Sequence, residues 1–279
     1  EDVLSDILRP ALRTNDFDAE KKVILEEIAM YADNPFWVLY EKLMEAYYGT
    51  HPLSHRVLGT VESINSLKRD EMLRYFENRY SADNTVVALA GRMDFDDVVR
   101  RIEMHCGSWQ RTNPAARIQR ITRNRIEFTH RSANVHRHYV LMLCPAPAME
   151  DDRRYAAAIL TQILGDAEGS RLYWSLIDTR LAEEAVAQYD GKDGLGEYLV
   201  YCSCDDANAA EVQAVAMREM EQLVDSLTED DLQRVRSKIA TDVTLHAELP
   251  AGRMRRLGRV WTYTGAYRSL EDELARSNA

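Results

Sequence analysis

The sequence lacks several features that would define broad classes of protein. No apolar run approaches the length of a membrane span, which excludes an ordinary transmembrane helix. The four cysteines show no disulfide-framework spacing, so reduced thiols are expected. Positive charge is also in deficit, because the 279 residues carry a net charge of −11, which argues against nucleic acid as a main partner. The composition, 46% hydrophobic and 29% charged, is that of a globular protein large enough for two domains.

The segment FDAEKKVILEEIAMYADNP, residues 17–35, has the pattern of a helix with carboxylates inside its apolar stripe. Residues three and four apart share a helix face, and the neighbours of Glu27 at these spacings are all apolar. Glu20 lies seven residues earlier, nearly two turns, so it points the same way. Glu26 falls on the polar side. A buried carboxylate needs compensation, either an internal ion pair with a basic residue or a metal with Glu27 as ligand.

The order of elements predicts an α+β protein of two domains, with antiparallel sheets and flanking helices. Helices are expected at 4–13, 16–33, 34–49, 68–80, 94–109 and 151–165, in SRLYWSLIDTR from Ser170, and from Ala207 almost without interruption to the end. Asn34 and Asp94 are predicted to cap the helices they begin, and only a short helix is expected from Thr60, because Ser63 stands where a capping box would have Glu. Strands are expected in NTVVALAG, RIEFTHR and VHRHYVLMLC, and in a hairpin around GKDGLG. The polar, aperiodic run 108–123 is predicted to be a linker between domains 1–107 and 124–279.

Two long segments resemble the pitrilysin/insulinase metallopeptidases, near the mitochondrial processing peptidase group. One runs from EKKVILEEIAMYADNP through HPLSHRVLGTVESINSLKRDEMLRYFENRYSADNTVVALAGRMD, and the other is YAAAILTQILGDAEGSRLYWSLID. The resemblance implies a zinc endopeptidase with an inverted H-x-x-E-H motif. It implies that Glu27 is the third zinc ligand and that Glu20, seven residues before it, supports catalysis.

The histidine pair that this family implies is absent from the sequence. No H-x-x-E-H occurs anywhere in the 279 residues, and the family places that motif farther upstream than the 26 residues before Glu27. We therefore expect the first domain to lack its beginning and the second domain to lack its end. The chain alone is expected to retain no zinc. The family's Arg and Tyr that bind the substrate backbone correspond to Ile177 and Glu184 in this sequence. The resemblance therefore identifies no substrate-binding residues.

Other histidines, cysteines and serines have simpler explanations. His51 and His55 have the spacing of zinc ligands on a helix, but Pro52 and the absence of a Glu between them favour a structural loop. Ser170 is expected to cap a helix, because no nucleophile elbow surrounds it. Two pairs could make a zinc site if their strands were adjacent, namely His136 with His138 and Cys202 with Cys204.

These features predict part of a zinc-dependent endopeptidase that cleaves peptides or unfolded segments and is inactive as given. The alternative is a non-catalytic partner subunit or scaffold of a peptidase-like complex. Either protein could form a homo- or heterodimer with a related peptidase chain. Natural substrate and oligomeric state are left open. The cytoplasm is the favoured location, although any targeting segment would precede residue 1.

Overall fold

The computed structural model describes the chain except residues 1, 115–120, 122, 134, 167 and 279. It divides into two compact units, Glu1–Arg125 and Ile126–Ala279. The expected linker, 108–123, falls at the end of the first unit, and residues 115–120 and 122 of it lie outside the described residues. None of the described helices has the length and apolar composition needed to cross a membrane.

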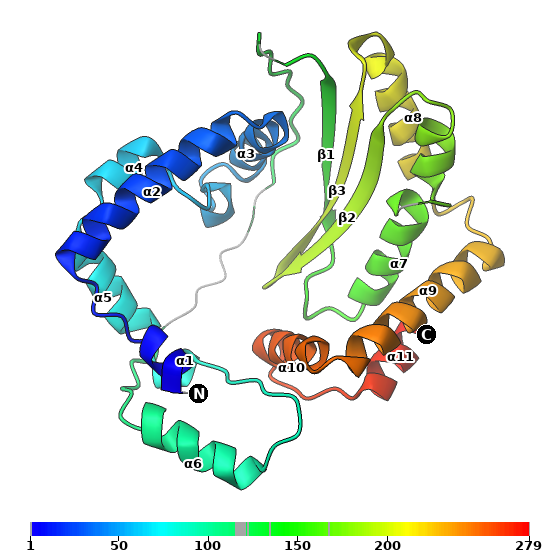
Figure 1. The fold of residues 1–279 in the computed structure, drawn as a ribbon. Coiled ribbons are helices and arrows are strands. Elements are labelled where there is room, and N and C mark those ends of the chain that lie inside the picture. Colours follow the sequence, from blue (N-terminus) through cyan, green and yellow to red (C-terminus); the bar gives the residue numbers. More distant parts are fainter. Residues whose placement is uncertain (1, 115–120, 122, 134, 167, 279) are drawn as a thin grey trace. The chain divides into compact units, whose positions relative to one another are not determined.

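The first unit is built from helices (Figure 1). They are α1 (Asp2–Ile7), α2 (Thr14–Ala32), α3 (Pro35–Tyr48), α4 (Val61–Ser66), α5 (Arg69–Arg79) and α6 (Phe95–Cys106), with short 3-10 turns at Pro52–Ser54 and Ala82–Asn84. Lys21 joins α2 to the end of α4, since its Nζ donates to the carbonyl oxygens of Asn65 and Leu67 at 2.9 and 3.1 Å. The unit therefore depends on contacts between helices.

Local capping explains where these helices begin and end. Asn34 Oδ1 accepts hydrogen bonds from the backbone of Phe36 and Trp37 at the start of α3. The same helix ends at Gly49, whose φ of 58° favours glycine. Thr60 and Ser63 form a reciprocal capping box on α4. The Ser63 side chain accepts a hydrogen bond from the Thr60 backbone, which is the role that Glu more often has in this motif.

The predicted strands NTVVALAG and RIEFTHR are wrong in the structure. Residues 85–90 and 125–131 have no assigned strand, and Val86, Val87 and Leu89 are exposed. A strand exists only when a neighbour accepts and donates its backbone hydrogen bonds, and neither segment has such a neighbour among the described residues. The apolar, β-branched composition that suggested strands is therefore insufficient by itself.

The second unit contains a three-stranded antiparallel sheet in the order β1-β3-β2. Its strands are β1 (His138–Ala146), β2 (Glu184–Lys192) and β3 (Leu195–Cys204). The predicted hairpin is confirmed, because Lys192 pairs with Leu195 across the two-residue Asp193-Gly194 turn and Gly194 has a φ of 70°. Together with the surrounding helices, this sheet confirms the α+β fold class.

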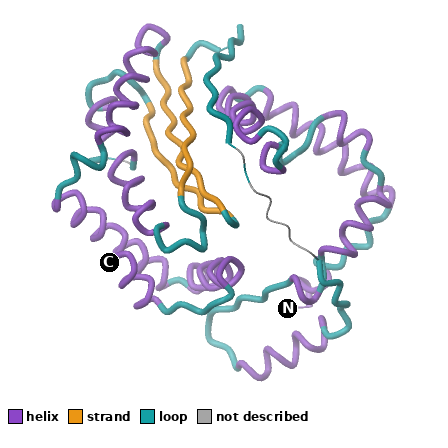
Figure 2. Tube along the Cα trace, turned by 180° about the vertical axis from the view of Figure 1, so that it is seen from behind, coloured by secondary structure: helices purple, strands orange, loops and turns teal. Residues whose placement is uncertain are grey.

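Helices cover one face of this sheet, as Figures 1 and 2 show. The helical elements of the unit are α7 (Arg154–Gly165), a π-helical turn (Tyr173–Ile177), a 3-10 turn (Asp206–Asn208), α8 (Ala209–Gln222), α9 (Glu229–Glu248), α10 (Pro250–Thr264) and α11 (Leu270–Asn278). Alternate residues of β3, Val200, Cys202 and Cys204, point into the same core as Ile163 of α7 and Val212 of α8. This apolar layer holds the sheet to its helices.

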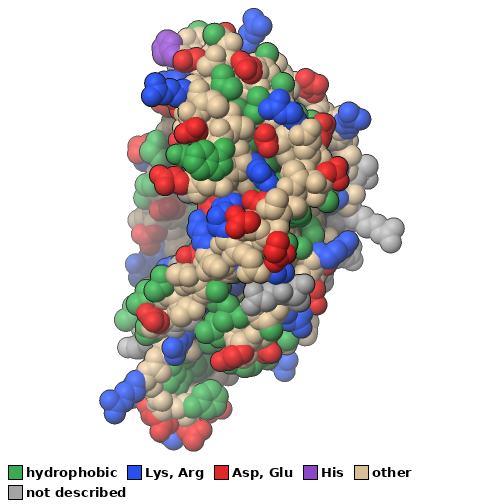
Figure 3. Space-filling view, turned by 90° about the vertical axis from the view of Figure 1, so that its right-hand side faces the viewer, with side chains coloured by type: hydrophobic (Ala, Val, Ile, Leu, Met, Phe, Trp, Pro, Cys, Tyr) green, Lys and Arg blue, Asp and Glu red, His purple; other side chains and the backbone are tan. Residues whose placement is uncertain are grey.

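Acidic and basic side chains intermingle on the face of the molecule drawn in Figure 3. Exposed ion pairs of this kind, such as Arg153 with Asp151 at 2.6 Å, each contribute little to stability.

A more buried group of polar side chains joins α11 to α7. Tyr155 donates a hydrogen bond to Glu273 at 2.8 Å, and the Arg154 guanidinium lies 3.6 Å from the same carboxylate. Stability of the second unit therefore depends on its core and this helix contact more than on surface charge.

Replacing Gly165 by Ala is expected to destabilise the protein, because α7 and β2 touch there. A Cβ at this position would lie 2.3 Å from the backbone nitrogen of Ala187 and 2.6 Å from its Cβ. We expect a loss of about 1–3 kcal/mol in unfolding free energy, measured by denaturant titration. Helix propensity alone predicts a small gain. Ala156→Gly on the exposed side of α7 is the control, at a cost of up to about 1 kcal/mol. Unchanged or increased stability in Gly165→Ala would contradict the close contact.

Glu197 is expected to make stability depend on pH. The side chain is 3% exposed, and burial raises the pKa of its carboxyl to about 7, although Lys192 Nζ lies 2.5 Å from Oε2. Because the pKa of Glu197 is higher in the folded state than in the unfolded state, protonation stabilises the folded protein. This contribution to the unfolding free energy is complete below pH 4.5, the ordinary pKa, and is lost as the pH rises through about 7. Glu197→Gln should therefore raise the melting temperature relative to the wild type more at pH 8 than at pH 5. A variant that is less stable than the wild type at pH 8 would mean that the Lys192 pair outweighs burial.

Candidate metal site on helix α2

Glu20 and Glu27 lie on the same side of α2, but neither is buried. Glu20 is exposed and Glu27 is half-buried. The predicted inward stripe is wrong in the structure, because α2 has no buried residue, and Val23 and Met30 are 54% and 62% exposed. The packed side of the helix lies about a quarter turn away and includes Lys21, which anchors α4. The apolar residues of α2 cover a wide arc, and only part of that arc meets a neighbouring helix.

The internal ion pair that could explain these carboxylates is not formed within the described part of the chain. No basic side chain there lies within ion-pair distance of Glu20 or Glu27. Lys21, the residue next to Glu20, donates instead to the backbone carbonyls of Asn65 and Leu67. Both carboxylates are therefore free to meet a group from outside the described residues.

These residues do not by themselves make a zinc site. Structural zinc takes four protein ligands and catalytic zinc takes three. Among the described residues, no three His, Cys, Asp or Glu side chains are arranged to hold a metal ion. Glu20 and Glu27 thus provide at most the carboxylate part of a site.

The loop around His51 has a structural role. His51 Nδ1 accepts a hydrogen bond from the Leu53 backbone at 3.2 Å and so caps the short turn Pro52–Ser54. In the same loop, Arg56 Nε lies 2.9 Å from Glu45 and 3.3 Å from Glu41, both on α3. The hydrogen bond to Glu45 raises the pKa of Arg56. The loop is thus fastened to α3, as expected of a structural segment.

The strands that carry the second group of candidate zinc ligands are adjacent, yet the ligands do not gather. His138 lies opposite Cys204 in the β1–β3 pairing. Cys202 and Cys204 are fully buried in the core, and burial raises the pKa of Cys202 to about 12. Zinc binds the thiolate, so a thiol in this environment is a poor ligand. His138 Nδ1 is instead 3.2 Å from Asp206 Oδ1, and His136 precedes the strand on an exposed segment.

The Gly-Ser-Arg-Leu segment also has a structural role. Ser170 Oγ accepts from the Tyr173 backbone at 3.2 Å and donates to the Asp166 carbonyl at 2.7 Å, as expected of a cap. Arg171 lies 2.6 Å from Asp231 at the start of α9. Ile177 packs against the core, and Glu184 accepts a hydrogen bond from the Tyr201 hydroxyl at 2.9 Å. Neither residue has the chemistry of the Arg and Tyr in the family.

An aromatic cluster that begins four residues after Glu27 was not predicted from the sequence. It consists of Tyr31, Phe36, Trp37 and Tyr40, at the junction of α2 and α3. Trp37 lies at its centre, with ring centroids 5.6 Å from Tyr31, 5.3 Å from Phe36 and 5.8 Å from Tyr40. The spacing of Glu27 and Tyr31, four residues on one helix face, was the available signal.

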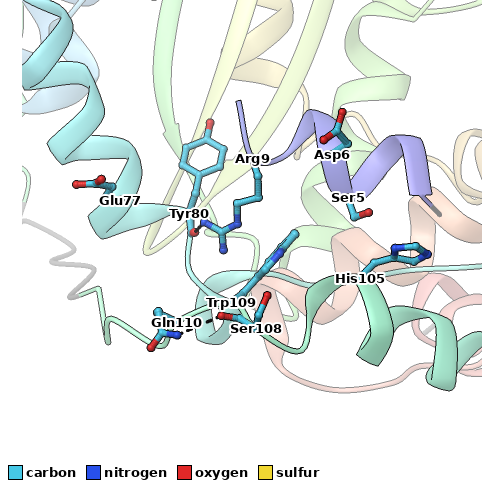
Figure 4. Close-up of a pocket in the computed structure, with 9 residues that line it drawn as sticks. All are labelled: Ser5, Asp6, Arg9, Glu77, Tyr80, His105, Ser108, Trp109 and Gln110. Atoms are coloured by element: carbon cyan, nitrogen blue, oxygen red, sulfur yellow. Dashed lines mark hydrogen bonds between the residues drawn. The ribbon is translucent and has the colours of Figure 1, made fainter. Parts of the chain in front are cut away.

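The first unit also contains an open cavity of about 620 Å³, shown in Figure 4. Arg9 lies against Trp109 there, with its guanidinium 4.1 Å from a ring centroid, and its Nη1 donates to the Tyr80 carbonyl at 2.7 Å. The other lining residues are Ser5, Asp6, Glu77, His105, Ser108 and Gln110. Glu20 and Glu27 do not line this cavity, so it is separate from the candidate metal site.

Known proteins similar to this chain agree on one family. The model described as the Peptidase M16 inactive domain matches residues 66–239, more than half of the chain. An uncharacterized zinc protease of Streptomyces coelicolor is 30% identical over 285 residues, which cover 99% of this chain and 62% of the relative. The chain thus spans less than two thirds of that relative's length.

Two solved structures share the fold. The peptidase M16 inactive domain from Pseudomonas fluorescens matches with a TM-score of 0.87 at 19% identity, covering 98% of this chain and 66% of that one. A chain of complex III2 from Candida albicans matches with a TM-score of 0.86 at 16% identity, covering 100% and 69%. At these identities the likeness concerns the fold alone. The family match, however, covers enough of the sequence to confirm the resemblance to metallopeptidases: the chain belongs to the M16 peptidase family.

Proposed function

We propose that the complete protein is a zinc-dependent endopeptidase that acts on peptides or unfolded segments. The supporting observation is the pair Glu20 and Glu27, seven residues apart on one side of α2, unburied and without an ion-pair partner among the described residues. Relatives named zinc proteases support the same class. Part of the complete protein outside these 279 residues would have to supply histidine ligands.

In this proposal the two carboxylates have different tasks. Glu27 is a metal ligand, because an ionised carboxylate oxygen is an accepted partner of zinc beside histidine nitrogens. Glu20 supports and orients the site from two turns away and does not bind the metal. Lys21, between them on the packed side, fixes the rotation of α2 through its bonds to α4. The helix therefore holds both carboxylates on one side.

A non-catalytic partner subunit is the second candidate. The replacement of the family's gripping Arg and Tyr by Ile177 and Glu184 favours it, as does the description of the matching family model as an inactive domain. A related peptidase chain in a homo- or heterodimer could supply the missing contacts. In that case the carboxylates on α2 would have no metal to bind.

The decisive experiment compares three substitutions in the full-length protein. Glu27→Gln should lower zinc content and abolish cleavage of a quenched peptide, since a neutral amide is a poor zinc ligand. Glu20→Gln should reduce cleavage about 10–100-fold with less effect on bound zinc. Because neither side chain is buried, both variants should melt close to the wild type when all three proteins are compared without zinc.

The matched control is Glu26→Gln, an exposed carboxylate on the polar side of the same helix, which should leave zinc and cleavage unchanged. Normal zinc content and normal cleavage in Glu27→Gln would refute the metal role of this residue. A wild-type protein that binds no zinc and cleaves no peptide would favour the partner-subunit alternative.

A further inference from the structure

We infer that the open cavity beside Arg9 binds a small organic anion. In this arrangement a carboxylate or phosphate group meets the guanidinium, and a flat apolar part of the ligand lies on the Tyr80 ring. The cavity volume of about 620 Å³ is within the range of about 300–1,000 Å³ that is typical of small-molecule sites. The proposed peptidase function does not require this site, because neither Glu20 nor Glu27 lines the cavity.

The first argument is that Arg9 is held in place by contacts that leave its charge unpaired. Its Nη1 donates to the Tyr80 carbonyl at 2.7 Å, and the guanidinium lies 4.1 Å from the Trp109 ring centroid. Neither contact supplies a formal negative charge. Within the described part of the chain no carboxylate forms an ion pair with Arg9, although Asp6 is only three residues away and lines the same cavity.

The free edge of the guanidinium is suited to an oxyanion. Nε and Nη2 lie on one side of the group, where their N–H bonds match the two oxygens of a carboxylate or phosphate. Neither nitrogen of Arg9 donates to an acceptor among the described residues. The stacking on Trp109 and the hydrogen bond to Tyr80 already fix the plane of the guanidinium, so an anion that binds there pays little additional conformational entropy.

Two carboxylates of the cavity wall leave this positive charge without a counter-ion. Figure 4 shows the carboxylate groups of Asp6 and Glu77 on opposite sides of the Arg9 guanidinium and apart from it. Both residues are exposed, so water solvates their charges. They still lie near enough to repel an anion bound at Arg9, and removal of either charge should therefore strengthen binding. A cationic ligand would show the opposite effect.

The rest of the cavity wall suits the organic part of the ligand. The Tyr80 ring stands beside the Arg9 side chain and is 49% exposed, although it packs on Phe76 with ring centroids 4.8 Å apart. A flat apolar group can lie on the exposed part of that ring. Polar groups of Ser108 and Gln110 border the same space. An inorganic ion would fill only a small part of this volume.

The test measures binding to the full-length protein by calorimetry at low ionic strength. The probes are benzoate, phenyl phosphate, inorganic phosphate and benzyl alcohol. We expect benzoate and phenyl phosphate to bind, inorganic phosphate to bind at least about 5-fold more weakly because it lacks the ring, and benzyl alcohol not to bind because it lacks the charge. Arg9→Gln should weaken binding of both aromatic anions at least about 10-fold. Arg9→Lys should also weaken it, since an ammonium group has no fork.

The matched control is Arg74→Gln, which removes an exposed arginine of α5 that does not line the cavity and should leave binding unchanged. Asp6→Asn and Glu77→Gln should each strengthen binding of benzoate about 2-fold or more. These two variants keep Arg9, so they test the inference even if Arg9→Gln fails to fold. Glu27→Gln should bind the probes as the wild type does, which separates this cavity from the candidate metal site.

Three results would overturn the inference: no binding of either aromatic anion, equal binding by Arg9→Gln and the wild type, or weaker binding in both Asp6→Asn and Glu77→Gln. The third would show that the cavity prefers cations. Equal affinity for inorganic phosphate and phenyl phosphate would overturn the placement of a ring on Tyr80. Normal zinc content and cleavage in Glu27→Gln would reject the metal role of that residue and leave the anion site unaffected.

Discussion

The second unit depends on the pairing of β3 with a strand on each side. β3 is the only described strand with two neighbours, so all its backbone groups can be paired within the sheet. This pairing sets alternate side chains of β3 against α7 and α8, and Val200, Cys202 and Cys204 become the centre of the core. The close contact of Gly165 with Ala187 follows from how tightly this layer packs.

In the first unit, the lack of a pairing partner prevents a predicted strand from forming. NTVVALAG is composed like a buried strand, but without a described neighbour to pair with it remains an irregular, exposed segment. Helices satisfy their own backbone hydrogen bonds, so α2 and α3 form where the sequence predicts them. The unit consequently presents Glu20, Glu27 and the aromatic cluster from elements whose geometry is local.

The two candidate functions differ in what they require of these helices. An endopeptidase requires the carboxylates of α2 to meet a metal, and it requires a surface that holds peptide. A partner subunit requires only the fold. The apolar and aromatic side chains around Glu27 are costly to expose unless something binds there.

Local interactions account for what the sequence alone determined. Asn34, Thr60 and Asp94 cap the helices they precede, and the Asp193-Gly194 turn forms the hairpin, because these effects involve residues close together in the chain. Residues Glu20 to Gly91 and the Gly-Ser-Arg-Leu segment likewise sufficed for the family. Only the tertiary structure decided which apolar residues are buried: Val23 and Met30 stay exposed, while Cys202 and Cys204 lie in the core. Helical periodicity places residues on a common face, but burial requires a partner surface from distant parts of the chain, and no local pattern specifies that partner.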